Sequence, residues 1–143
     1  MKAKVVLLVE DSADDEMFTL RAFRRALNLT SVVVARDGEE AVGLLFGEEG
    51  RQGARPDLIL LDLKVPKLDG FEVLRLIRQN DRLKLVPVVI MSSSGEEHDV
   101  DRSYSLGANS YIRKPIGYES YQDAIRQIGT YWLGLNFPQK AAE

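Results

Sequence analysis

Two carboxylates stand out in the stretch LILLDLKVPKLDG, which runs from Leu58 to Gly70. Asp62 follows four consecutive apolar residues, and Asp69 directly precedes a glycine. Burying an unpaired charge is very costly. Asp62 therefore lies at the exposed tip of a strand, pairs with a cation, or takes part in chemistry.

Other apolar segments of this chain also end in polar residues. VVLLV is followed by Glu10 and Asp11, PVVIM by Ser92, Ser93 and Ser94, and SYIR by Lys114. Each of these has an ordinary explanation when it is taken alone, because acids often cap helices, serine runs occur in exposed loops, and Lys-Pro pairs occur in turns. Their shared position at the ends of apolar segments is what indicates a site.

The elements that must position these residues alternate along the chain. Five short apolar segments have the composition of strands: Val5–Val9, Ser31–Ala35, Leu58–Asp62, Pro87–Met91 and Ser110–Arg113. Continuous apolar runs suit strands that are covered on both faces.

Between the strands, apolar residues recur with helical spacing. Such faces are Leu20, Phe23 and Leu27; Ala41, Val42 and Leu45; Val73, Leu74 and Ile77; and Tyr121, Ile125, Ile128 and Trp132. The remaining segment, Asp99–Leu106, is the least apolar, with Gly107 as its expected C-cap. The alternation predicts an α/β fold, a flavodoxin-like, doubly wound, five-stranded parallel sheet of order 2-1-3-4-5 with five helices.

In such a sheet, ligands bind just beyond the carboxyl ends of the strands. With this strand order, the three acids, the serines and Lys114 converge on one edge. Clustered carboxylates repel one another unless a cation neutralises them. Oxygen ligands, with no cysteine and no nearby histidine, favour a hard divalent ion such as Mg²⁺. An aspartate oxygen can attack phosphorus, and a metal, a lysine and a hydroxyl supply the charge neutralisation that phosphoryl transfer requires.

Composition limits the other possibilities. The chain has 143 residues, of which 45% are hydrophobic and 29% charged, and its net charge is −3. This balance favours neither nucleic acid nor an anionic membrane as a partner. The absence of cysteine excludes disulfides and thiolate chemistry. No apolar run approaches the roughly 20 residues of a membrane span, so a cytoplasmic location is expected.

These motifs together resemble the receiver domain of two-component response regulators, from about Lys4 to Ile128. The matching residues are Glu10, Asp11, Asp62, Pro66, Asp69, Gly70, Ser92, Tyr111, Lys114 and Pro115. The resemblance implies that Asp62 is the phosphoacceptor and that a histidine kinase is the partner. It also implies that the chain is a switch, which assists its own phosphorylation and dephosphorylation, and not an enzyme.

The resemblance assigns roles to the other residues as well. Glu10, Asp11, Asp62 and the backbone carbonyl of Lys64 would hold Mg²⁺. Ser92 and Lys114 would bind phosphoryl oxygens, and the rotamer of Tyr111 would follow the state of Ser92. The Lys114–Pro115 peptide bond would be cis. Two positions depart from common patterns: Glu10 stands where many receivers have aspartate, and Lys64 is expected to tune the lifetime of the phosphorylated state.

A loop and the C-terminal segment indicate a particular group of receiver domains. A glycine-rich loop (residues 47–56) and the ending YWLGLNFP (residues 131–138) are similar to small single-domain regulators that work with phytochrome-type kinases. We expect a receiver domain over residues 1–130 and a C-terminal extension over residues 131–143, with the helix stopping beyond Trp132. The segment YWLGLNFP contains five large apolar residues, and one helix face can bury two or three of them against the sheet.

The remaining apolar residues of that ending would be exposed, and exposed apolar patches mark interaction sites. The expected interaction is a homodimer through the face of the fourth helix, fifth strand and fifth helix, together with the tail. A kinase-docking arm, or a tail folded over the fifth helix, is the alternative. With no output domain expected, signalling would pass through protein contacts.

Three other classes share parts of this pattern. An aspartyl-phosphate hydrolase would carry a second aspartate two residues after the nucleophile, where this chain has Lys64. A flavodoxin-like cofactor carrier would need a phosphate-cradling loop after the first strand, where this chain has the acidic EDSADDE. A nucleotide-binding domain would need a G-x-G-x-x-G or P-loop motif, and neither occurs. His98, the single histidine, is expected at a solvated helix start.

Overall fold

The computed structural model describes residues 3–26, 30–48 and 50–140. Strands and helices alternate in the order β1 (Lys4–Val9), α1 (Ala13–Ala26), β2 (Thr30–Ala35), α2 (Gly38–Phe46), β3 (Leu58–Leu61), α3 (Gly70–Gln79), β4 (Val88–Ser92), α4 (Glu97–Ser105), β5 (Ser110–Arg113) and α5 (Tyr118–Thr130), followed by a π-helical turn η1 (Tyr131–Leu135).

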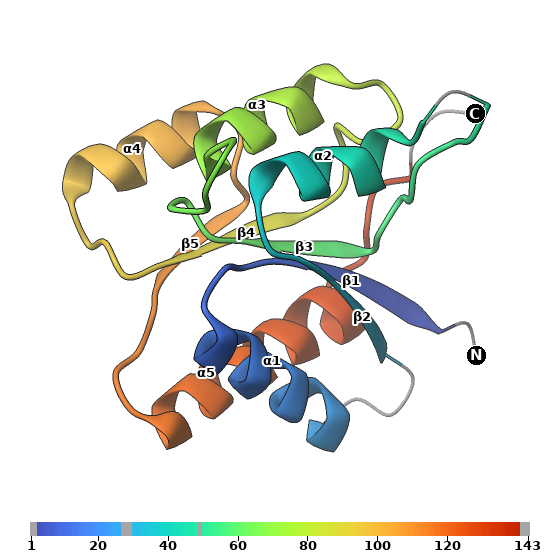
Figure 1. Ribbon diagram of the computed structural model, residues 1–143. Helices are drawn as coiled ribbons and strands as arrows, with labels where there is room; N and C mark the ends of the chain where they lie inside the picture. The colour runs from blue at the N-terminus through green and yellow to red at the C-terminus, as the bar shows by residue number, and fades with distance from the viewer. Residues whose placement is uncertain (1–2, 27–29, 49, 141–143) are drawn as a thin grey trace.

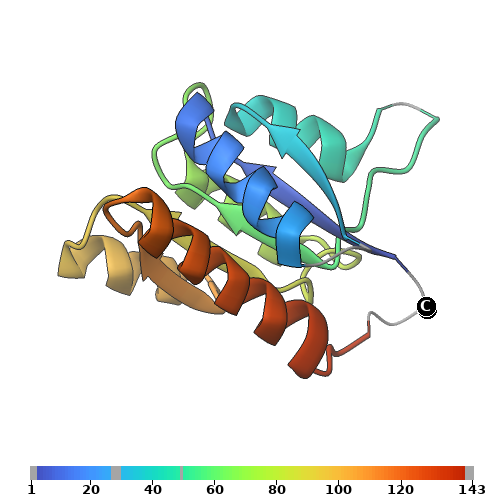
Figure 2. The same ribbon diagram turned by 90° about the horizontal axis from the view of Figure 1, so that it is seen from below.

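The strands form one parallel sheet in the order β2-β1-β3-β4-β5, which confirms the predicted topology. Helices α2, α3 and α4 cover one face, and α1 and α5 cover the other (Figure 1). Seen from below, α1 and α5 lie side by side under the sheet (Figure 2). The carboxyl ends of all five strands therefore meet at a single edge, which is the edge that holds the predicted site.

Two apolar layers hold this arrangement together. The layer under α2, α3 and α4 includes Leu61, Leu74 and Ile90, and the layer under α1 and α5 includes Phe23 and Ile125. Strands β3 and β4 are buried along their whole length, as their continuous apolar sequences predict. Leu27, expected on the buried face of α1, lies outside the described residues.

The element ends differ from the sequence expectations by a residue or two. Asp62 directly follows β3, Ser92 is the last residue of β4, and α4 begins earlier than expected, at Glu97. Gly107 follows the last turn of α4 with φ +103°, so it occupies the left-handed position that glycine favours after a helix. His98 lies in the first turn of α4 with its side chain 78% exposed, as predicted.

The glycine-rich loop between α2 and β3 is held by Arg82. The guanidinium of Arg82 donates hydrogen bonds to the carbonyl oxygens of Gly53 and Ala54, each at 3.2 Å, and to that of Leu45. In return, Arg55 Nε donates to the carbonyl oxygen of Arg82 at 3.1 Å. The loop is therefore fixed to the turn after α3, although most of its side chains are exposed.

The chain continues past Trp132 in helical form, so the expectation that the helix stops there is wrong. The Asn136 N–H donates to the Tyr131 carbonyl at 2.6 Å, which closes the wide turn η1. Trp132 and Leu133 pack against the core, whereas Leu135 and Phe137 are 74% and 97% exposed. None of the helices described here is long and apolar enough to cross a membrane.

Candidate functional site

Three carboxylates meet at the carboxyl edge of the sheet. Glu10 and Asp11 follow β1, Asp62 follows β3, and one oxygen from each lies within 4.8 Å of the others. Glu10 and Asp62 are buried, at 2% and 8% exposure, whereas Asp11 is exposed. The sequence prediction that these acids converge is therefore confirmed.

The Lys114 ammonium lies among three carboxylates. Its Nζ atom is 2.7 Å from Glu10, 2.8 Å from Asp62 and 2.8 Å from Asp15. An ammonium has three donors, so each N–H faces one acid. Lys114 thereby neutralises part of a charge cluster that would otherwise repel itself in a buried place.

Backbone contacts fix Asp62 in this position. Its N–H donates to the Val9 carbonyl at 3.1 Å, and the Lys64 N–H donates to Asp62 Oδ1 at 3.1 Å. Gly70 passes so close that a Cβ there would lie 2.5 Å from the Asp62 carbonyl oxygen. Asp69 caps α3 by accepting the Glu72 N–H at 3.0 Å. The second carboxylate of the opening stretch is therefore structural.

The electrostatics of the cluster follow from its burial. Burial raises the pKa of the Glu10 carboxyl to about 7; the Lys114 hydrogen bond opposes this rise and the Asp62 charge adds to it. Burial alone would lower the pKa of the Lys114 ammonium, but its hydrogen bonds to Asp15, Asp62 and Glu10 raise it well above its usual range. Lys114 therefore remains charged at neutral pH.

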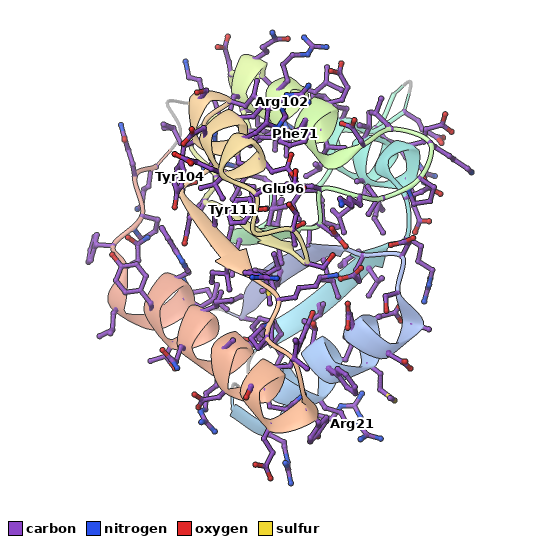
Figure 3. All side chains as sticks on the ribbon, turned by 90° about the vertical axis from the view of Figure 1, so that its left-hand side faces the viewer. Arg21, Phe71, Glu96, Arg102, Tyr104 and Tyr111 are labelled. Atoms are coloured by element: carbon purple, nitrogen blue, oxygen red, sulfur yellow. The ribbon has the colours of Figure 1, made fainter. Side chains whose placement is uncertain are left out.

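Ser92 and Tyr111 are linked through Ser94. Ser92 is fully buried, and its Oγ accepts the Ser94 N–H at 3.2 Å. The Tyr111 hydroxyl donates to the Ser94 carbonyl at 2.7 Å. Tyr104 lies beside Tyr111 between α4 and β5 (Figure 3), and its hydroxyl accepts the Tyr111 N–H at 3.1 Å. Ser92 and Tyr111 thus both bond to the main chain of Ser94 in the β4–α4 loop, Ser92 to its N–H and Tyr111 to its carbonyl.

The same loop is tied to α4. The Ser94 hydroxyl donates to Asp99 Oδ2 at 2.6 Å, and this hydrogen bond holds the pKa of the Asp99 carboxyl below its usual value. One turn further along α4, the Arg102 guanidinium lies 4.1 Å from the centre of the Phe71 ring of α3 (Figure 3). Helix α4 is held mainly by polar and cation–π contacts, which agrees with its weakly apolar sequence.

The expected cis bond before Pro115 is wrong, because the Lys114–Pro115 peptide is trans. Trans is the more stable form even before proline, by about 0.5–1 kcal/mol. The turn into α5 is made two residues later by Gly117, whose φ of +97° lies in the left-handed region. The Lys114 N–H still donates to the Ser92 carbonyl at 2.7 Å, so the lysine keeps its register beside β4.

Two residues of this site were not singled out from the sequence. Asp15 lies in the first turn of α1, and EDSADDE offers several acids with no sign of which one faces inward. Ser94 was one of three consecutive serines, and only the fold shows that it is the one that joins Tyr111 to Asp99. Helical phase relative to the strand end would have been the signal for Asp15.

The donor set fits a divalent cation. Glu10, Asp11 and Asp62 offer only oxygen atoms, and they lie close enough to share one ion. Hard cations such as Mg²⁺ and Mn²⁺ prefer such ligands. The Lys64 carbonyl stays a predicted ligand, and the hydrogen bond from the Lys64 N–H to Asp62 Oδ1 holds the backbone of Lys64 near the site.

Comparison with known proteins identifies the family. A family model described as the response regulator receiver domain matches residues 6–126. The chain belongs to this family. Receiver domains are regulatory switches, so the resemblance inferred from the sequence is confirmed at this level.

Individual relatives of this receiver cover most of its length. The probable methanogenesis regulatory protein FilR2 of Methanothrix harundinacea is 39% identical over 132 residues, covering 92% of this chain and 85% of its own. Response regulator Rcp1 of Synechocystis is 39% identical over 131 residues, covering 91% and 89%.

Solved structures give the same result. The phosphorylated cyanobacterial phytochrome response regulator RcpA has a TM-score of 0.90 and 37% identity, covering 96% of this chain and 99% of its own. The Mn²⁺-bound form of Rcp1 has a TM-score of 0.88 and 37% identity, covering 95% and 99%. This receiver is therefore similar to phytochrome-associated response regulators, as the sequence indicated.

Proposed function

We propose that this receiver accepts a phosphoryl group on Asp62 from a histidine kinase and signals through protein contacts. The observation that carries the proposal is the placement of Asp62, buried at the end of β3 within reach of two further acids and 2.8 Å from Lys114. The residues present combine a nucleophile, a metal-binding donor set and a fixed cation, and phosphoryl transfer requires these three components.

The chemistry follows from these positions. An Asp62 carboxylate oxygen attacks the phosphorus of a phosphohistidine, an O–P bond forms, and the N–P bond breaks with its electron pair left on the imidazole. Mg²⁺ held by Glu10, Asp11, Asp62 and the Lys64 carbonyl would neutralise charge on the phosphoryl oxygens. Lys114 binds one of these oxygens and Ser92 donates its hydroxyl to another.

The switch follows from the hydrogen bonds of the β4–α4 loop. In this structure, Ser92 Oγ accepts a hydrogen bond from the Ser94 N–H. When Ser92 turns toward the phosphoryl group, this hydrogen bond breaks. Ser94 also holds Tyr111 through its carbonyl and Asp99 through its hydroxyl. A movement of Ser92 therefore disturbs the contacts of both β5 and α4, and it biases a two-state surface made of α4, β5 and α5.

A direct measurement tests this function. We expect the intact mass of the protein to rise by one phosphoryl group after incubation with acetyl phosphate and Mg²⁺, and not when the metal is chelated. The proposal would be contradicted if the mass stayed unchanged with acetyl phosphate and Mg²⁺, and also after incubation with a phosphorylated histidine kinase and Mg²⁺. Turnover of a phosphate ester in place of stable labelling would instead support a hydrolase.

The pKa of Glu10 gives a pH dependence for the proposed Mg²⁺ site. Because burial raises this pKa to about 7, the carboxyl is protonated below that pH and must lose its proton to bind an ion. We expect Mg²⁺ affinity to be retained above pH 7 and to weaken by up to about tenfold per pH unit below it. Calorimetry at pH 6 and pH 8 measures this change, and equal affinities would count against Glu10 as a ligand.

A phytochrome-type kinase is the proposed partner class. The structural similarity to RcpA, described as a phytochrome response regulator, supports this choice. FilR2 has the same sequence identity to this chain as Rcp1, 39%, so sequence identity does not decide the partner class. The structural match to RcpA and the YWLGLNFP ending support the phytochrome-type kinase. Faster phosphoryl transfer from a phytochrome-type kinase than from an unrelated histidine kinase is the expected result.

We also propose a homodimer formed through the α4–β5–α5 face and the C-terminal extension (residues 131–143) that follows the receiver unit (residues 1–130). The exposed side chains of Tyr131, Leu135 and Phe137 support this, because clustered apolar groups mark interaction sites. A symmetric dimer is the commonest assembly of identical chains.

Substitution of the exposed tail residues tests the dimer. We expect the double variant Leu135→Ser, Phe137→Ser to sediment as a monomer at concentrations where the wild type is dimeric, and still to take phosphate at Asp62. Both residues lie outside the packed core, so folding should be unaffected. The control Val33→Ser alters an exposed apolar residue of β2 and should stay dimeric. A wild type that is monomeric at every concentration would overturn the dimer.

A further inference from the structure

Among the residues that the structure describes, Asp15 is the one carboxylate paired with Lys114 that lies outside the predicted metal-binding set. Its Oδ2 accepts from Lys114 Nζ at 2.8 Å, yet the group of oxygens close enough to share an ion comprises only those of Glu10, Asp11 and Asp62. Asp15 therefore contacts the lysine without competing for the ion. The other two partners of Lys114, Glu10 and Asp62, belong to the metal-binding set.

The backbone of Asp15 is fixed on both sides. Its N–H donates to Ser12 Oγ at 3.3 Å, and its carbonyl accepts from Thr19 Oγ1 at 2.8 Å. Thr19 is fully buried. The Asp15 side chain is 23% exposed, and it lies in the first turn of α1, where a helix favours negative charge. The backbone that carries the Asp15 carboxylate is therefore fixed independently of Lys114, and the carboxylate itself contacts the Lys114 ammonium.

We propose that Asp15 is a positioning residue that keeps Lys114 at the edge of the site when a divalent cation takes Glu10 and Asp62. Lys114 loses two of its three acceptors when those carboxylates turn toward an ion. Asp15 then remains as the acceptor that holds the ammonium beside Asp62, ready for a phosphoryl oxygen. This inference rests on the proposed metal site.

Removal of Asp15 would leave Lys114 with two acceptors, Glu10 and Asp62, which are both predicted metal ligands. Without Asp15, the ammonium has only the metal ligands to pair with, so an incoming cation must displace it with no replacement partner. The site also loses one negative charge, which weakens its attraction for a cation. Both effects act in the same direction and reduce the affinity for the ion.

The test compares Asp15→Asn with Asp14→Asn. Asp14 is the neighbouring acid in the same turn of α1 and is exposed, so its substitution removes the same charge without touching Lys114. We expect calorimetry with Mg²⁺ to show an affinity about three- to tenfold weaker in Asp15→Asn than in Asp14→Asn. Asp15→Glu, which keeps the carboxylate, should recover part of the loss.

A second measurement does not depend on affinity or on phosphorylation. The ¹⁵N signal of the Lys114 ammonium at saturating Mg²⁺ should indicate an ordered side chain in the wild type and in Asp14→Asn, and a mobile one in Asp15→Asn. If Asp15→Asn and Asp14→Asn bound Mg²⁺ with equal affinity and Lys114 stayed ordered in Asp15→Asn, the inference about Asp15 would be wrong, while the proposed metal site would still stand. Failure of the wild type to bind Mg²⁺ would overturn the metal site and the inference together.

Discussion

Asp62→Asn should abolish phosphorylation of this receiver. The asparagine amide has the shape of the carboxylate but cannot act as the nucleophile toward phosphorus, and it removes one anionic metal ligand. The fold should be retained, because the Asp62 backbone N–H and the Lys64 N–H keep acceptors in the variant. Intact mass after incubation with acetyl phosphate and Mg²⁺ measures the result.

The matched control for this variant is Asp69→Asn. Asp69 lies in the same connection between β3 and α3, and its side chain caps α3, a role that asparagine fills equally well. This variant should label like the wild type. Labelling of Asp62→Asn to the same extent as Asp69→Asn would remove the central role of Asp62.

Lys114→Met should destabilise the protein in the absence of a divalent ion, by about 3–5 kcal/mol in the free energy of unfolding at neutral pH. The methionine keeps much of the volume but leaves the acids around it, two of them buried, without their cation. Saturating Mg²⁺ should restore most of the lost stability, because the ion replaces the missing charge. Denaturant titrations with chelator and with Mg²⁺ measure both effects.

An exposed lysine provides the comparison for Lys114. Lys84→Met removes a surface lysine that is 3.4 Å from Asp81, and such a pair contributes at most about 1 kcal/mol. Its stability should be close to that of the wild type and insensitive to Mg²⁺. If Lys114→Met behaved in the same way, the three-acid contact would not stabilise the folded state. Phosphorylation of Lys114→Met should in either case be slowed, since a phosphoryl oxygen has lost its cation.

Much of the fold was predictable because its signals are local. The continuous apolar runs of β3 and β4 reflect burial on both faces, and the chain order of strands and helices then leaves few topologies. The acids Glu10 and Asp62 were predictable for the same reason, since a charge directly after a buried strand must lie at the sheet edge. The segment of α4 was the hardest element to predict, because its sequence, EHDVDRSYS, has few apolar residues and its buried residue is Ser103.

The remaining features depend on contacts between distant residues. Asp15 contacts Lys114 across 99 positions of sequence, and the packing of α1 against α5, the helix that follows Lys114, brings them together. Lys114 has three buried or half-buried acidic partners, which give it a structural role in addition to the phosphoryl-binding role expected from the sequence.

The position of Trp132 has a consequence for observing this protein in solution. It is the only tryptophan of the chain, and its ring packs against the core while the next exposed apolar groups begin three residues later. The ring of Tyr131 lies edge-to-face with it, 5.0 Å away between centroids. Indole emission depends on the polarity around the ring, so the chain carries an intrinsic optical probe at the base of its tail. Trp132 follows the C-terminal end of α5, whereas Lys114 precedes the N-terminal end of the same helix. The wavelength of the Trp132 emission maximum therefore records events at the tail separately from events at the phosphoacceptor.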